Sequence, residues 1–219
     1  MKITRREFCR STATVALATA LLGASALSPF EGLALADTIP AAELMKPDAL
    51  PEMSMGNDKA PVTVIEYASM TCPHCAQFHE TTYPELKKRY IDTGKVRFIF
   101  REFPLDPLAA GASMLARCAD KEQFFPLIET LFHQQRQWAV EKPIPPLMAL
   151  AKQAGFSEQK FNACLSDQKM LDAMQVEQKR ASEKFGVSST PTLFVNGRIQ
   201  KGGMSIDDLA KVIDPLLKS

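Results

Sequence analysis

The sequence predicts an α/β fold in which a mixed central β-sheet is interrupted by an inserted helical domain. Three observations support this fold class. A strand, a helix and a second strand follow one another within residues 60–107, a long stretch of helical periodicity occupies 108–185, and strand signals return only within 186–219. Strands joined through a helix must run parallel, whereas a late hairpin is antiparallel, so the sheet is mixed and helices should cover both faces.

The composition is that of a soluble globular protein. The chain has 219 residues, of which 46% are hydrophobic and 23% are charged, a balance that allows a sizeable core to be buried. The formal net charge is +1, so the protein has no strong field of either sign with which to collect phosphate backbones or anionic lipid. We therefore expect no nucleic acid among its partners.

Residues 1–36 have the pattern of a cleaved export signal. A basic start is followed by a small, apolar run over residues 11–27 and by a small-residue cleavage site, after which we expect cleavage behind Ala36. The paired Arg5 and Arg6 resemble a twin-arginine signal, and an ordinary general-secretion signal is the alternative. Both routes end outside the cytoplasm.

A membrane anchor is not expected, because the apolar run is broken by Ser, Thr and Gly and is shorter than the ~20 strongly apolar residues of a membrane span. Of the five cysteines, Cys9 precedes the apolar run and should leave with the signal. The mature chain then keeps an even number, which permits two disulfides in an oxidising compartment. These cysteines are Cys72, Cys75, Cys118 and Cys164.

The first part of the mature chain divides into an arm and a strand-helix-strand unit. Residues 37–59 contain several prolines and no sustained period, so they are interpreted as an N-terminal arm. The β-branched run 61–67 predicts a buried strand, the helical spacing over 73–92 predicts a helix, and the alternation over 96–102 predicts a second strand.

The rest of the chain is predicted to be helical and then to end in a hairpin and a helix. The expected helices of the insertion lie near residues 108–119, 121–136, 145–154, 157–165 and 168–185. Trp138 should pack inside this block. The turn Asn196-Gly197 predicts a hairpin, and Ser205 is a plausible N-cap for the last helix.

The motif Cys72-Pro73-His74-Cys75 lies where the first strand gives way to the helix. Unpaired backbone N–H groups and the positive end of the helix dipole stabilise a thiolate there, and Pro73 is tolerated in the first turn. Cys72 is the predicted exposed nucleophile, and Cys75 is the deeper, resolving thiol. His74 can donate a hydrogen bond to the thiolate and neutralise it when protonated. The pattern predicts thiol–disulfide redox chemistry.

Two simpler interpretations of the motif are weaker. A zinc site needs a second group of ligands, but Cys118 and Cys164 are far apart in the sequence and the chain has only 3 histidines. A purely structural disulfide between Cys72 and Cys75 would close almost no loop and stabilise little. We therefore expect neither a metal nor a cofactor. The other two histidines, His79 and His133, have no comparable context and are interpreted as surface or packing residues.

Several features together resemble one known family. They are the run Glu66-Tyr67 ahead of the Cys72 motif, the helical insertion, and the late segment 186–197 that contains Thr190-Pro191. From about residue 60 to 217 the chain resembles the DsbA-like thiol:disulfide oxidoreductases of the bacterial periplasm. On its own, Thr190-Pro191 is only a turn signal, since cis is a minority state of X-Pro bonds.

The resemblance implies a thioredoxin fold interrupted by helices, and a monomer in the periplasm. It implies that Pro191 is cis, that Thr190 and Pro191 contact the active-site sulfurs and pair with substrate backbone, and that Glu66 is buried and relays protons. The Thr190 hydroxyl would also lie close to the Cys72 sulfur. Oxidising export and this resemblance favour a Cys118–Cys164 disulfide, and two buried free thiols are the alternative.

Function is expected to follow from the Cys72–Cys75 pair. The first hypothesis is a dithiol oxidase that introduces disulfides into exported proteins and is re-oxidised, as the resemblance implies, by a DsbB-like quinone-linked membrane partner. The second is a reductase or isomerase that uses the same dithiol. A third hypothesis, from a different class, is a protein that binds a soft metal or acts as a holdase.

Overall fold

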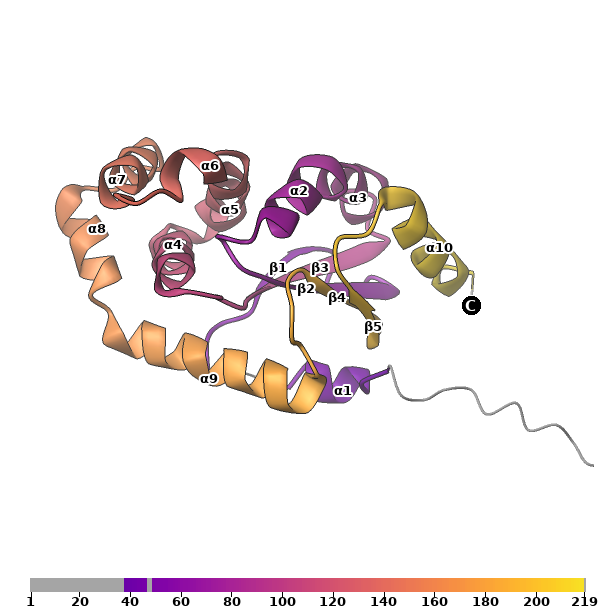
Figure 1. The fold of residues 1–219 in the computed structure, drawn as a ribbon. Coiled ribbons are helices and arrows are strands. Elements are labelled where there is room, and N and C mark those ends of the chain that lie inside the picture. The colour runs from indigo at the N-terminus through magenta and orange to yellow at the C-terminus, as the bar shows by residue number, and fades with distance from the viewer. Residues whose placement is uncertain (1–37, 47–48, 219) are drawn as a thin grey trace, which may run out of the picture. The chain divides into compact units, whose positions relative to one another are not determined.

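A five-stranded sheet forms the centre of the protein (Figure 1). The computed structural model describes residues 38–46 and 49–218, so the predicted signal with Cys9 and the cleavage site at Ala36 lie outside the described residues. The strands are β1 Met53–Gly56, β2 Val62–Ala68, β3 Val96–Glu102, β4 Thr192–Val195 and β5 Arg198–Lys201. Their order is β1-β3-β2-β4-β5, in which β2 and β3 are parallel and the other pairs are antiparallel. The parallel β2/β3 pair and the antiparallel β4/β5 hairpin were predicted, so the sheet is mixed as expected.

Helices cover both faces of this sheet. Figure 1 shows α2, α3 and α10 on one face, and α1 with the end of α9 on the other. The helices are α1 Ala41–Leu44, α2 Pro73–Thr81, α3 Tyr83–Leu86, a π-helical turn Lys87–Ile91, α4 Pro107–Cys118, a 3₁₀ turn Lys121–Gln123, α5 Phe124–His133, α6 Gln135–Trp138, α7 Ile144–Gln153, α8 Glu158–Leu165, α9 Gln168–Phe185 and α10 Ile206–Leu216. The predicted α/β fold with a helical insertion is therefore confirmed.

Strand β2 lies in the middle of the sheet and carries the active-site motif at its end. Val64 packs into the larger hydrophobic core, whereas its neighbour Ile65 points to the other face and packs into a smaller one. A strand that is buried on both faces needs apolar side chains at nearly every position, which explains the unbroken β-branched run. The chain leaves β2 at Ala68 and enters α2 at Pro73, so the cysteines lie at the carboxyl end of the central strand.

The inserted helices are held together by a buried tryptophan and a disulfide. Trp138 is fully buried, and its indole Nε1 donates to Leu131 O at 2.7 Å. Cys118 at the end of α4 is bonded to Cys164 in α8, with the two Cα atoms 6.1 Å apart. The structure thus contains the disulfide that the family resemblance favoured.

The segment interpreted as an arm is part of the fold, which corrects that interpretation. Met53–Gly56 forms strand β1 and pairs antiparallel with β3 at the sheet edge. Leu44 in α1 is buried, and its carbonyl accepts a hydrogen bond from Arg101 Nη2 at 2.7 Å. Sequence reasoning missed this strand because four residues are too few for the alternation of Met with Ser and Gly to stand out, and because its pairing partner is supplied by β3.

Two predicted helices are each divided. The expected helix over residues 73–92 becomes α2, α3 and a π-helical turn, with Pro84 near the start of α3, where a residue without an N–H is tolerated. The expected helix over 121–136 separates at Gln134 into α5 and α6. In the described ranges, no helix combines the length and the apolar character that crossing a bilayer requires.

Candidate active site

The two cysteines occupy the start of α2. Cys72 is the N-cap, with extended backbone angles, and Pro73 is the first helical residue. Both thiols are free. Cys72 is 6% exposed and Cys75 is 0% exposed, so the predicted order of depth holds, although Cys72 is more covered than the exposed nucleophile that was predicted.

The surroundings of the motif shift the pKa values of the two thiols in opposite directions. The hydrogen bond from the Cys75 thiol, the Thr190 side chain, and the backbone N–H groups of Cys75 and His74 together lower the pKa of Cys72 to about 5, against the opposing effect of burial. Burial raises the pKa of Cys75 strongly, and the nearby Cys72 and Glu66 raise it further. At neutral pH Cys72 is therefore a thiolate and Cys75 a thiol.

The loop before β4 lies directly against the nucleophile. The Thr190-Pro191 bond is cis, as the resemblance implied, and the protonated Cys72 Sγ donates to Thr190 O at 3.3 Å. Thr190 is separated from Cys72 by 118 positions in sequence. The Thr190 hydroxyl is buried and has no hydrogen-bond partner within the described residues. This carbonyl and this hydroxyl are the groups of the loop that face the reacting sulfur.

Glu66 is buried behind the cysteines, and its partner is a histidine that sequence reasoning treated as ordinary. Glu66 is 0% exposed, and its Oε2 lies 3.0 Å from Nε2 of His79, which is 1% exposed. His79 follows Cys75 by four positions on α2, which places both side chains on one face of the helix. That spacing was the signal that could have identified it.

The His74 ring is placed differently from the prediction. The residue is exposed, and in the described ranges no hydrogen bond joins its ring to Cys72. The contribution of His74 to the lowered pKa of Cys72 comes from its backbone N–H, which is a smaller cause than the hydrogen bond from the Cys75 thiol. The effect of the ring stays a prediction, which His74→Ser tests: loss of a ring contribution would raise the pKa of Cys72.

A family model described as thioredoxin matches residues 48–215. The chain belongs to the thioredoxin family. Among solved structures, alpha-DsbA1 from Wolbachia pipientis is 33% identical with a TM-score of 0.75, and the match covers 81% of this chain and 96% of that chain. The predicted DsbA-like resemblance and the thioredoxin fold are therefore confirmed.

Two curated relatives extend the comparison. A Rickettsia conorii protein, provisionally named as a protein-disulfide oxidoreductase, is 36% identical over 76% of this chain. The DsbA-like chain spans 61% of the length of that relative. The Bacillus subtilis disulfide bond formation protein D is 29% identical over 75% of this chain and 76% of its own length.

Sequence reasoning missed one residue of the helical insertion that reaches this site. Gln135, at the start of α6, is 7% exposed, and its Nε2 donates to Met70 O at 2.8 Å and to Cys72 O at 3.0 Å. One amide group therefore ties the insertion of this DsbA-like chain to the motif. Nothing in the sequence pointed to it, because the contact depends on how the insertion packs against the loop.

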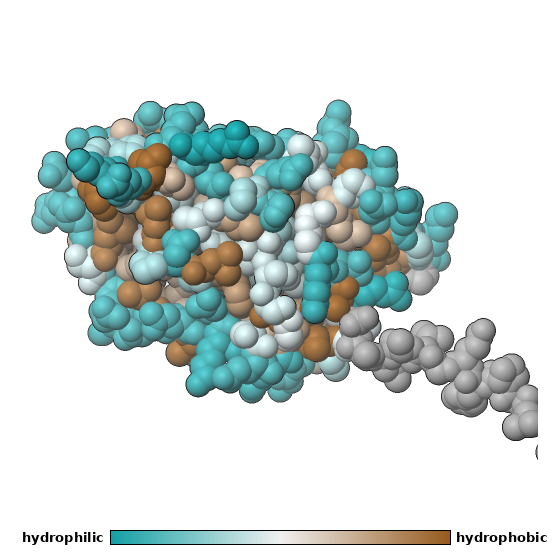
Figure 2. Space-filling view, in the orientation of Figure 1, coloured by the Kyte–Doolittle hydropathy of each residue, from teal (hydrophilic) through white to brown (hydrophobic). Residues whose placement is uncertain are grey.

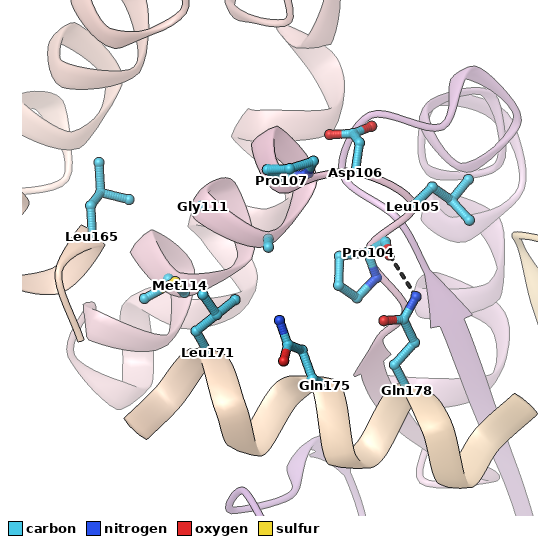
Figure 3. Close-up of a pocket in the computed structure, with 11 residues that line it drawn as sticks. Pro104, Leu105, Asp106, Pro107, Gly111, Met114, Leu165, Leu171, Gln175 and Gln178 are labelled. Atoms are coloured by element: carbon cyan, nitrogen blue, oxygen red, sulfur yellow. Dashed lines mark hydrogen bonds between the residues drawn. The ribbon is translucent and has the colours of Figure 1, made fainter. Parts of the chain in front are cut away.

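One largely apolar surface pocket has neither active-site cysteine among its lining residues. A pocket of about 460 Å³ between α4, α8 and α9 is lined mainly by apolar side chains, and Gln178 Nε2 donates to Pro104 O at its rim (Figure 3). Its one carboxylate, Asp106, caps α4 and accepts a hydrogen bond from Thr71. Figure 2 shows hydrophobic surface on this face only as small, separate patches. On the face shown, hydropathy does not single out one site.

Proposed function

We propose that this DsbA-like chain is an exported thiol:disulfide oxidoreductase that acts as a dithiol oxidase on the cysteines of exported proteins. The observation that carries the proposal is the environment of Cys72, which lowers the pKa of this thiol to about 5. A stabilised thiolate is a good leaving group and makes the disulfide form a stronger oxidant. The name of the Bacillus subtilis relative, a disulfide bond formation protein, favours the same direction.

The reaction begins with the Cys72–Cys75 disulfide. A substrate thiolate attacks Cys72 Sγ, the Cys72–Cys75 bond breaks, and Cys75 leaves with the electron pair and takes up a proton. The second substrate thiolate then attacks the substrate sulfur of the mixed disulfide, and Cys72 leaves as a thiolate. The substrate loses two electrons and the pair Cys72/Cys75 gains them.

The loop before β4 offers a backbone acceptor to which a substrate can bind. When Cys72 is protonated, its thiol donates to Thr190 O, but neither the Cys72 thiolate nor a sulfur in a disulfide has a proton to donate. In the oxidised protein this carbonyl is free to accept a backbone N–H from an extended substrate, in the manner of an added strand. Pro191 has no N–H and does not compete for that pairing.

The proposal includes export and a partner. The signal pattern in residues 1–36 supports passage to the periplasm, by the twin-arginine route or the general one. Re-oxidation of the dithiol requires an electron acceptor, and a DsbB-like quinone-linked membrane protein is the acceptor that family membership suggests. The chain is proposed to act as a monomer.

Stoichiometric oxidation of a reduced two-cysteine peptide tests this function. We expect the oxidised protein to convert the peptide to its disulfide at neutral pH. Cys72→Ser and Cys75→Ser, neither of which can form the Cys72–Cys75 disulfide, are controls that should leave the peptide reduced. Efficient reduction of insulin together with failure to oxidise the peptide would instead identify a reductase.

A further inference from the structure

Two titratable side chains from different elements meet in the core behind Cys75. Glu66 from β2 and His79 from α2 are 0% and 1% exposed, and their Oε2 and Nε2 atoms are 3.0 Å apart. The other two polar atoms of the pair, Glu66 Oε1 and His79 Nδ1, are buried and have no hydrogen-bond partner among the residues described. The pair therefore has one shared hydrogen bond and two buried polar atoms whose hydrogen-bonding capacity is unused among the described residues.

Stability does not explain such a pair. Burying a carboxylate and an imidazole has a large desolvation cost, and a single hydrogen bond that leaves two polar atoms unpaired offsets it poorly. Apolar side chains of similar volume would fill the site at least as well. A chemical role near the cysteines is the better explanation, and Glu66 lies close enough to raise the pKa of Cys75.

The packing fixes the direction in which the histidine points. Its ring stacks on Phe132, with centroids 4.2 Å apart, and lies 4.7 Å from the ring of Tyr83 on the opposite element α3. The Phe100 ring in β3 meets the histidine ring edge to face, with centroids 6.2 Å apart. Held by three rings, His79 keeps Nε2 directed at Glu66, so the hydrogen bond needs no rearrangement during a reaction.

We propose that His79 holds Glu66 in a proton-sharing pair, and that this pair, rather than Glu66 alone, supplies and removes the proton of Cys75. The proposal rests on the dithiol chemistry of the proposed function but applies in either direction of exchange. His79 acts through Glu66 and is therefore a positioning residue.

The proton has a defined path in each direction. When a thiolate opens the Cys72–Cys75 disulfide, Cys75 leaves with the electron pair and receives a proton from the pair. In the reverse direction the Cys75 S–H bond breaks and its proton passes to the pair. Cys75 Sγ then bonds to Cys72 Sγ, and the sulfur that was attached to Cys72 departs as a thiolate.

Other titratable groups face the pair from the surrounding elements. Cys75 and Cys72 lie on α2, Tyr83 lies on α3, and Glu129 of α5 interacts with Tyr83. Burial and the two carboxylates raise the pKa of Tyr83 above its ordinary value, so this phenol keeps its proton throughout the working range and does not compete. The pair is then left as the proton carrier beside Cys75.

The two steps of the reaction with oxidised glutathione test the proposal in one experiment. Cys72 first attacks glutathione disulfide to form a mixed disulfide, and Cys75 then resolves it and releases glutathione. Both steps can be followed by acid quenching and mass spectrometry from about pH 5 to 9. Because only the second step moves the Cys75 proton, we expect His79→Gln to slow it by about tenfold or more and to flatten its pH profile, while the first step is unchanged.

Two further variants distinguish a role in proton transfer from a purely structural role. Gln keeps an N–H donor for Glu66 but cannot share a second proton, so a purely structural role predicts wild-type behaviour for His79→Gln and a defect only for His79→Phe. His133→Gln, on an exposed histidine outside the pair, is the matched control and should match the wild type in both steps. A second step in His79→Gln with the wild-type rate and pH profile would overturn the proposal.

A measurement on the unaltered protein tests the proton-sharing pair even if the variants do not fold. The ¹⁵N shifts of the His79 ring report which ring nitrogens carry protons, and we expect these shifts to differ between the dithiol and disulfide forms at neutral pH. Identical shifts in both redox states would overturn the proposal. Neither result depends on whether the protein oxidises or reduces its substrates, so a failed oxidase assay would overturn only the proposed function.

Discussion

At the scale of single residues, the charge on Cys72 is the feature from which the chemistry follows. Ultraviolet absorbance of the thiolate in reduced protein should titrate with a midpoint near the pKa of about 5 that its surroundings produce. A Cys72→Ser variant should lack this transition, because burial keeps Cys75 protonated. A midpoint close to the ~8.5 of a free thiol would remove the physical basis of an oxidase.

The same pKa links pH to the stability of the reduced protein. The pKa of Cys72 is lowered in the folded state, so ionisation stabilises the fold fully above about pH 9 and less as pH falls, until the effect is lost near pH 5. Urea unfolding of the reduced wild type and of Cys72→Ser across this range should therefore converge at acidic pH. A constant difference between the two would contradict the shift.

Thr190 is expected to favour chemistry at the expense of stability. Its buried hydroxyl has no hydrogen-bond partner in the described ranges, yet its side chain helps to lower the pKa of Cys72. Thr190→Val should raise that pKa. Below about pH 5, where Cys72 is protonated, the variant should also increase the free energy of unfolding of the dithiol form by about 1 kcal/mol, whereas at neutral pH the lost stabilisation of the thiolate opposes this gain. Ser188→Ala, on an exposed position of the same loop, is the control and should change neither.

Sequence reasoning succeeded for residues whose role is local. Cys72 and Pro73 lie at a strand-to-helix junction, and the thiolate-stabilising geometry follows from those neighbours alone. His79 and Gln135 were missed as parts of the site because their roles depend on partners, Glu66 and the Cys72 carbonyl, that only tertiary packing brings near. The family resemblance supplied Glu66 and Thr190, which local pattern could not have done.

At the scale of secondary-structure elements, α6 is connected to the active-site loop through one side chain. Gln135→Ala removes the donor that Met70 O and Cys72 O share. We expect a loss of about 1–3 kcal/mol in the free energy of unfolding, since buried carbonyls lose a partner. Urea denaturation checks this, with Gln137→Ala on the exposed side of α6 as a control that should behave as wild type.

The bond between α4 and α8 stabilises the helical insertion. Cys118 and Cys164 are separated by 46 positions, and closing a loop of that size stabilises by about 4 kcal/mol in the chain-entropy model. The double Ser variant should lose free energy of unfolding on this scale and keep the Cys72 thiolate midpoint. Peptide mapping under alkylating, non-reducing conditions that finds both thiols free would contradict the bond itself.

Element boundaries were predicted well where the sequence has strong periodicity and poorly where it does not. The helices α4, α8 and α9 begin and end within a residue or so of their predicted limits, because caps such as Asp106, Ser157 and Asp167 mark them. Strand β1 was missed, since a four-residue edge strand depends on the hydrogen bonds that β3 offers rather than on its own pattern.

At the scale of the whole molecule, the fold brings together three parts of the chain that are distant in sequence. The cysteines follow the central strand, and Gln135 comes from the helical insertion. Thr190, which lies in the loop before β4, is 118 positions from Cys72 in the sequence. The order of elements sufficed to predict the mixed sheet, because a helix between two strands and a terminal hairpin leave few topologies. The side-chain contacts between these parts were beyond any pattern in the sequence.

The equilibrium redox potential of the Cys72–Cys75 couple, measured in glutathione buffers at neutral pH, tests the central claim most directly. A thiolate stabilised to a pKa of about 5 favours the reduced form, so we expect a potential well above the about −270 mV of thioredoxin, toward the about −120 mV of DsbA. A potential at or below that of thioredoxin would contradict the proposed oxidase.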